Sequence, residues 1–172
     1  MSYENQAGQP YAGPTPPSYY AAPQAFSPRP RVGFVDAIKQ FYSRYATFTG
    51  RSNRSEYWWV VLFIAIVNAI LVIPYAIAVG SYAASISAAD TLEAQQAAAA
   101  NYPVAAGLFG ILLLVWGLAN IVPGLAVSVR RLHDGGFSGW FILLGLIPAV
   151  GGIILIFLYV MESKPDGERY GA

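Results

Sequence analysis

Three long stretches of this chain carry no Lys, Arg, His, Asp or Glu: Tyr57 to Ala89, Ala94 to Val129 and Gly135 to Met161. A helix needs roughly 20 mostly apolar residues to cross a hydrocarbon core about 30 Å thick, and each stretch contains such a run. Because the bilayer core offers no hydrogen bonds to an exposed backbone, a helix is the expected form of each apolar segment. The three stretches therefore predict an all-α membrane protein.

Composition excludes several classes of function. Charged residues make up 11 % of the 172-residue chain, against about 25 % in a typical soluble domain. A net charge of +1 does not suggest the clustered basic face of a nucleic-acid-binding protein, so no nucleic-acid partner is expected. The chain has no cysteine, which excludes disulfides, thiolate metal sites and cysteine nucleophiles. We expect no cofactor and no metal site.

The amino-terminal part divides into two segments. Residues 1–32 are rich in Pro, Tyr, Gln and Ala without a hydrophobic period, so we expect a disordered tail, either solvated or serving as a ligand for a partner. In residues 33–48, apolar side chains recur at helical steps of three and four. They are Phe34, Ile38, Phe41, Tyr45 and Phe48. This amphipathic helix is too short to span, and we expect it to lie in the headgroup region or on the protein's own cytoplasmic surface.

Three transmembrane helices are expected, at about residues 57–79, 103–129 and 137–161. Trp58 and Trp59 open the first span, where amphipathic rings favour the membrane interface. In the loop between the first two spans, the capping-box spacing of an acidic pair predicts a short helix outside the bilayer, over residues 91–101.

The basic residues predict the orientation of the spans. Six basic residues precede the first span. The loop after that span has no basic residue and two acidic ones, Asp90 and Glu93, whereas the next loop has Arg130 and Arg131. Lys and Arg gather on the cytoplasmic side, so the amino end and the second loop are expected inside. Three spans then place the carboxyl end outside.

The third span allows two interpretations. Pro148, Gly151 and Gly152 interrupt it, and they could either kink one helix or turn it into a hairpin that returns the tail to the cytoplasm. Each arm of a hairpin would have about a dozen residues, too few to cross. We therefore expect one kinked helix.

Charged residues beside the spans are the candidate functional residues. By the orientation argument, the segment before the first span and the segment after the second lie at the same inner membrane face. The candidate inner-face cluster comprises Arg51, Arg54, Glu56, Arg130, Arg131, His133 and Asp134. We expect Glu56 to pair with Arg130 or Arg131, and Ser52, Asn53 or Ser55 to cap the first span.

Several interpretations of this cluster remain open. Its guanidinium groups suit the oxygens of an anionic lipid headgroup or phosphate, but charges at these positions also anchor helix ends and set topology. His133 is the only histidine, and it either carries a proton or is simply hydrogen-bonded in a turn. Glu56 and Asp134 could act as acid and base, or they could form ion pairs.

The same two segments resemble a known family. Gly50–Trp58 reads Gly-Arg-x-x-Arg-x-Glu-Tyr-Trp, and Arg130–Trp140 reads Arg-Arg-Leu-His-Asp-x-x-x-Ser-Gly-Trp. Both are similar to motifs of the domain of unknown function 805 family, small bacterial inner-membrane proteins, over about residues 34–171. Gly167–Gly171 lacks the Asn of the family's Gly-x-Asn-x-Tyr-Gly tail. The resemblance implies a bacterial inner-membrane protein and no particular reaction.

Within the spans, the polar side chains of interest are Asn68 and Asn120. Counted from the inner ends of their helices, both lie about 15 Å deep at 1.5 Å per residue. Equal depth predicts an interhelical hydrogen bond worth about 0.6–2 kcal/mol. The alternative is a polar patch on a substrate path.

Together these features predict a multi-pass protein of the bacterial plasma (inner) membrane with its amino terminus in the cytoplasm. The leading interpretation is a non-catalytic interaction or accessory protein whose basic face meets anionic phospholipid or a membrane protein partner. A small oligomeric transporter or channel is the alternative, although the spans lack the ionisable groups of coupled transporters. A lipid-modifying enzyme ranks third, and a homo-oligomer is left open.

Overall fold

The computed structural model describes residue 26 and residues 29–171, and this part of the chain contains helices and no strand. In chain order the helices are α1 (Phe34–Ser43), α2 (Arg54–Ser87), α3 (Leu92–Ala100), α4 (Val104–Asp134), η2 (Gly139–Leu146), α5 (Val150–Val160) and η3 (Pro165–Tyr170), where η marks a 3-10 helix. The all-α prediction is confirmed for these residues. Most of the tail predicted to be disordered, residues 1–32, lies outside them.

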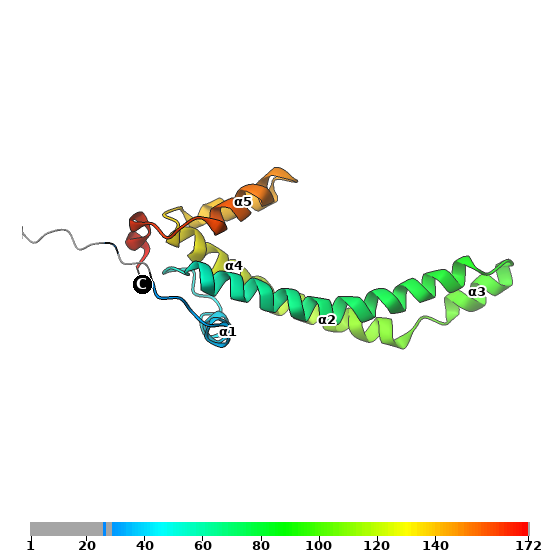
Figure 1. Ribbon diagram of the computed structural model, residues 1–172. Helices are drawn as coiled ribbons and strands as arrows, with labels where there is room; N and C mark the ends of the chain where they lie inside the picture. Colours follow the sequence, from blue (N-terminus) through cyan, green and yellow to red (C-terminus); the bar gives the residue numbers. More distant parts are fainter. Residues whose placement is uncertain (1–25, 27–28, 172) are drawn as a thin grey trace, which may run out of the picture.

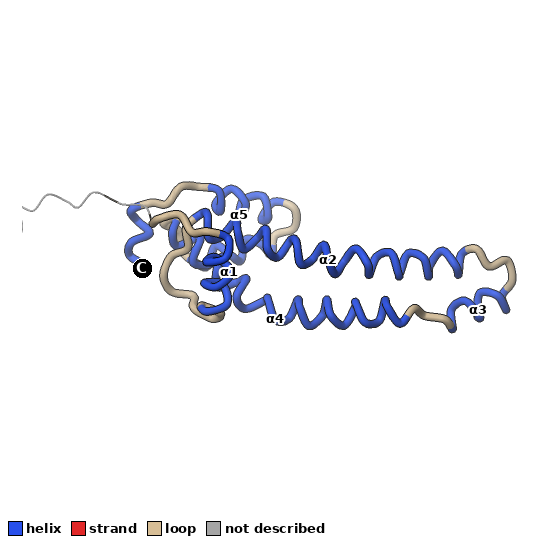
Figure 2. Tube along the Cα trace, turned by 60° about the horizontal axis from the view of Figure 1, so that its bottom comes forward, coloured by secondary structure: helices blue, strands red, loops and turns tan. Residues whose placement is uncertain are grey.

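Helices α2 and α4 form a long antiparallel pair (Figures 1 and 2). They have 34 and 31 residues, about 51 and 46 Å at 1.5 Å per residue, and both are long and apolar enough to cross a membrane. Only 6 % of the most apolar window of each is buried within the protein. A helix that is apolar all round and uncovered by protein requires lipid as its solvent.

The far end of this pair is closed by α3. Helix α2 continues past the predicted boundary at residue 79 to Ser87, because the sequence there is rich in Ala, the strongest helix former, and has no proline. The hydroxyl of Thr91 caps α3 by accepting from the Ala94 amide at 3.2 Å, and Tyr82 of α2 donates to the Ala99 carbonyl at 2.9 Å. The short helix predicted over residues 91–101 is thereby confirmed.

Helix α1 lies across α2 and α4 near the opposite end of the pair (Figure 1). Ala37 and Phe41 are buried, and the Tyr42 ring meets Phe63 of α2 edge-on, with centroids 6.3 Å apart. The Tyr45 hydroxyl donates to the carbonyl of Ala119 in α4 at 2.6 Å. One face of α1 therefore packs on the protein itself.

Residues 137–161 do not form the single kinked helix predicted for a third span. Helix η2 ends at Leu146, the chain turns at Pro148 and Ala149, and α5 packs back against η2. Ala149 adopts a left-handed φ of 63°, and a Cβ on Gly151 would lie 1.7 Å from the Leu144 carbonyl oxygen. With 11 residues, α5 measures about 16 Å, half of a hydrocarbon core. The segment is a helical hairpin and not one kinked helix, and the predicted count of three spans is not confirmed.

This hairpin returns the carboxyl tail to the end of the bundle where α2 begins. The Lys164 amide donates to the Asp134 carbonyl at 2.9 Å, and the Gly50 amide donates to the Tyr170 carbonyl at 3.0 Å. In Figure 1 the red helix η3 lies near the end of the bundle where α2 begins and far from α3. The expectation that the carboxyl end lies at the opposite end of the bundle from the start of α2 is also wrong.

Candidate functional site

Seven polar residues are buried where α2 begins and α4 ends. Charged side chains are rarely buried completely unless they are paired, yet the three charged residues Arg130, Arg131 and Asp134 have no exposed surface. We call the set the inner-end cluster, and it comprises Ser52, Asn53, Glu56, Arg130, Arg131, His133 and Asp134. The structure thus brings five of the seven candidate residues together, whereas Arg51 and Arg54 lie outside the cluster.

Arg131 fixes the carboxyl tail to the last turn of α4. Its Nε donates to the Tyr159 carbonyl at 3.0 Å, and its Nη2 donates to the Met161 carbonyl. Its Nη1 donates to Asp134 Oδ2 at 2.5 Å, an oxygen that also accepts from Ser163 Oγ at 2.6 Å. Because Arg131 and Asp134 have 0 % exposure, no water replaces these bonds, and losing one partner would leave a buried charge unpaired.

Arg130 holds the segment that follows α1. Its Nη1 donates to the carbonyls of Thr47 at 2.6 Å and Arg44 at 3.2 Å. Its Nη2 lies 3.7 Å from Glu56 Oε1, so the predicted Glu56 partner is Arg130, as an ion pair without a direct hydrogen bond. Burial lowers the pKa of Arg130 and the Glu56 carboxylate opposes this shift. The guanidinium nevertheless stays charged.

His133 is enclosed between the segment that precedes α2 and the carboxyl tail. Its Nδ1 lies 3.2 Å from the Gly50 carbonyl, and its ring stacks on Tyr170 with centroids 3.9 Å apart and planes 4° apart. Burial lowers the pKa of His133, although the Gly50 bond opposes this. In the contact with Gly50, Nδ1 carries a proton, since a carbonyl can only accept. Within residues 29–171, no three His, Asp or Glu side chains gather to hold a metal.

Asn53 begins α2 and also holds the extended segment before α1. Its Oδ1 accepts from the Glu56 amide at 2.8 Å, which confirms it as the predicted helix cap. Its Nδ2 donates to the Pro30 carbonyl at 2.6 Å, and the Val32 amide donates to Ser55 Oγ at 2.8 Å. Residues 30–32 are therefore fixed against the start of α2.

The four arginines predicted to meet a lipid headgroup divide into two pairs. Arg130 and Arg131 are completely buried and hold backbone carbonyls of this chain, so they cannot reach a headgroup. Arg54 and its ion-pair partner Glu162, 3.2 Å away, have side chains 48 % and 84 % exposed. Arg51 Nε donates to the Gly171 carbonyl at 3.1 Å. Arg51 and Arg54, the two arginines outside the inner-end cluster, therefore remain available to lipid.

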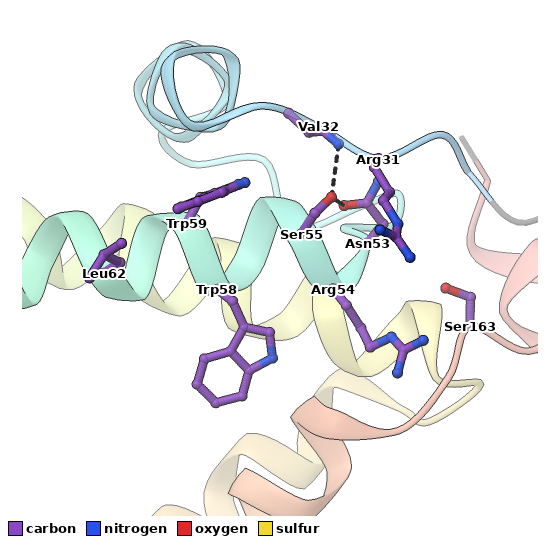
Figure 3. A pocket seen from close by; sticks show the side chains of 9 residues that line it. All are labelled: Arg31, Val32, Asn53, Arg54, Ser55, Trp58, Trp59, Leu62 and Ser163. Carbon is purple, nitrogen blue, oxygen red and sulfur yellow. Dashed lines mark hydrogen bonds between the residues drawn. The ribbon is translucent and has the colours of Figure 1, made fainter.

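A groove of about 730 Å³ opens beside Arg54. Figure 3 shows the side chains that surround it, with Arg31 and Arg54 toward one end and Leu62 beyond two tryptophans at the other. The groove is lined by Arg31, Val32, Asn53, Arg54, Ser55, Trp58, Trp59, Leu62 and Ser163. Its cationic end and apolar end suit an amphipathic anion.

The two intramembrane asparagines do not bond to each other as predicted. Asn68 Oδ1 accepts from the Trp116 indole at 3.1 Å. Asn120 donates to the Trp116 carbonyl at 2.8 Å and accepts from the Tyr42 hydroxyl at 3.3 Å. Trp116 thus lies between them, and sequence reasoning missed it because a tryptophan inside an apolar run gives no signal of a polar contact.

Tyr170 and Ser163 were also missed as members of the site. Both belong to the tail, which the sequence assigned to the opposite end of the bundle. The only sequence signal for Tyr170 was its place in the Tyr-Gly ending that resembles the family tail. Its role becomes visible once the hairpin brings it onto His133.

Comparison with known proteins agrees with a membrane assignment. The chain is similar to inner membrane protein YhaH of Escherichia coli strain K12, with 31 % identity over 137 residues that cover 80 % of this chain and 94 % of that protein. It is also similar to inner membrane protein YhaI of the same strain, with 30 % identity over 127 residues that cover 74 % and 85 % of the two chains. No solved structure matches.

The family model described as protein of unknown function (DUF805) matches residues 45–172. This range includes both motifs that carry the resemblance, the α2–α4 pair, the hairpin and the tail. The chain therefore belongs to the DUF805 family, whose relatives found here are inner membrane proteins.

Proposed function

We propose that this chain is a non-catalytic membrane protein that crosses the inner membrane twice and binds anionic phospholipid on its cytoplasmic face. The observation that carries the proposal is the position of all ten Lys and Arg residues, which gather at the end of the bundle where α2 begins. The loop at the other end has Asp90 and Glu93 and no basic residue. The positive-inside rule then assigns the basic end to the cytoplasm.

The η2–α5 hairpin determines at which end of the bundle the basic residues of the tail lie. With a third span, Lys164 and Arg169 would lie across the membrane from the other basic residues. With the tail returned, as its bonds to Asp134 and Gly50 indicate, both lie at the basic end. The proposed topology therefore has the amino-terminal helix α1 and the carboxyl tail in the cytoplasm, and the η2–α5 hairpin enters and leaves from the same face.

The contacts of the inner-end cluster support a structural role for it. Arg130 and Arg131 bind carbonyls of their own chain, and His133 is covered by Tyr170. A general acid or base must lie within hydrogen-bond reach of a substrate, and these three side chains are buried behind segments of their own chain. They suit a fold-stabilising cluster better than a catalytic one.

A transporter or channel, the alternative from the sequence, gains less support. The Asn68 side-chain oxygen is bonded to the Trp116 indole, and both ends of the Asn120 amide are bonded, to Trp116 and Tyr42, so most of their polar groups are used within the protein. The exposed basic residues, by contrast, favour anionic lipid, since each Lys or Arg near an anionic membrane surface contributes about 1 kcal/mol. We therefore propose lipid binding in place of transport.

The proposal predicts a preference for one lipid charge. The full chain, purified in detergent, is titrated with phosphatidylglycerol or with phosphatidylcholine of the same acyl chains, and bound lipid is counted by native mass spectrometry. Phosphatidylglycerol is expected to bind at least about fivefold more tightly, the effect of one arginine contact, and the preference should weaken at high salt. Equal binding of the two lipids would contradict the proposal.

A further inference from the structure

We infer that the groove beside Arg54 binds one anionic phospholipid, with the headgroup phosphate between Arg31 and Arg54 and an acyl chain along Trp58 and Leu62. The inference rests on the proposed function and names the site at which it would occur. It depends on three features of the groove: the fixed position of Arg31, the charge around Arg54, and the order of side chains along α2.

Arg31 is held over the groove by its neighbours. The Pro30 carbonyl accepts from Asn53, and the Val32 amide donates to Ser55, so the residues on both sides of Arg31 are fixed to the start of α2. Arg31 lines the groove, and within residues 29–171 it has no ion-pair partner.

The charge at this end of the groove is positive. Arg31 and Arg54 line it, and Glu162 is the acidic residue that pairs with Arg54. Because the Glu162 side chain is 84 % exposed, it can rotate into water at little cost when a phosphate takes its place. Two guanidinium forks then face the phosphate oxygens, the geometry in which arginine binds phosphate best.

The order of side chains along α2 favours a lipid over free phosphate. Arg54, Trp58 and Leu62 follow one another at steps of four and so share one helix face. Leu62 is about 12 Å farther along the axis than Arg54. A cation, an indole and an aliphatic side chain in this order match a headgroup, the interface and an acyl chain, because tryptophan favours the interface. Inorganic phosphate would use only the first of the three.

The tail completes the groove. Ser163 lines it, and the same hydroxyl donates to Asp134 of the inner-end cluster. The walls therefore come from residues 31–32, the start of α2 and the tail, three segments that meet because the η2–α5 hairpin folds back. A protein that lost the hairpin would lose one wall of the site.

The test uses the full chain, the lipid titration described above and four single variants. Arg31→Gln and Arg54→Gln each remove one groove cation, whereas Lys39→Gln removes an exposed cation of α1 that does not line the groove. We expect phosphatidylglycerol to bind about fivefold more weakly to each groove variant and unchanged to Lys39→Gln, from about 1 kcal/mol per contact. Arg54→Lys keeps the charge and should retain most of the binding, which separates loss of charge from misfolding.

The possible outcomes distinguish an error in the groove assignment from an error in the proposed function. If the native chain prefers phosphatidylglycerol and the groove variants bind it as well as Lys39→Gln does, the groove assignment is wrong and the proposed function stands. If the native chain shows no preference, both are wrong. Displacement of the lipid by an equal concentration of inorganic phosphate would show that the groove recognises phosphate alone, which overturns the lipid assignment.

Discussion

Replacing Arg131 with Gln is expected to lower the free energy of unfolding by about 3–5 kcal/mol, the usual effect of breaking a buried ion pair. The substitution leaves the Asp134 carboxylate buried without its cation and removes the donors to the Tyr159 and Met161 carbonyls. The tail should then detach from α4. Thermal unfolding in detergent measures the first effect, and trypsin cleavage after Arg169 in the folded protein measures the second.

Two further variants make this result interpretable. Arg54→Gln removes an exposed ion pair and should change the stability by no more than about 1 kcal/mol. Adding Asp134→Asn to Arg131→Gln removes the orphaned charge and should recover part of the loss. If Arg131→Gln is no more harmful than Arg54→Gln, Arg131 does not hold the tail.

Gly151→Ala is expected to cost about 3 kcal/mol and to open the hairpin. The added Cβ would lie 1.7 Å from the Leu144 carbonyl oxygen, so η2 and α5 must move apart. The clash is with backbone, which cannot rotate away, so the cost belongs at the upper end of the range for overpacked sites. Thermal unfolding and tail cleavage by trypsin again report the result.

The adjacent glycine provides the matched control. A Cβ on Gly152 meets nothing within 4 Å, and alanine is the better helix former by about 1 kcal/mol. Gly152→Ala should therefore leave the protein equally stable or slightly more so. If Gly151→Ala and Gly152→Ala lose similar amounts of stability, the close approach of η2 and α5 does not hold the hairpin together.

The hairpin also shows where prediction from the sequence failed. Residues 137–161 are as apolar as a true span, and composition alone cannot distinguish a helix that crosses from two short arms. What favours two short arms is the close contact of Gly151 with Leu144 and the hydrogen bonds from Arg131 to the carbonyls of Tyr159 and Met161. These contacts form only in the folded chain, so a count of apolar residues did not predict them.

Local signals were predicted better than long-range ones. Asn53, one of three predicted caps, caps α2, whereas Thr91 caps α3 one residue after Asp90, where the capping-box spacing had placed the cap. Both helix starts could be inferred approximately because a cap depends on residues within one turn. The burial of Arg130 and Arg131 could not be inferred, since it depends on segments that pack over them from elsewhere in the chain.

The intramembrane asparagines illustrate the same limit. Depth along a helix follows from the rise per residue, and the equal depths of Asn68 and Asn120 led to the prediction that they bond to each other. A contact also depends on how each helix is rotated about its axis. The indole of Trp116 donates to Asn68, whereas Asn120 bonds to the Trp116 carbonyl one turn away.

In the proposed topology, the amino-terminal helix α1 and the carboxyl tail share one side of the membrane. The chain has no cysteine, so single cysteines at the exposed positions Lys39, Asp90 and Glu168 can each be tested in cells with an impermeant thiol reagent, before and after lysis. We predict labelling of Asp90→Cys in intact cells, and of Lys39→Cys and Glu168→Cys only after lysis. Labelling of Glu168→Cys in intact cells, with Lys39→Cys protected, would place the tail across the membrane and contradict the account.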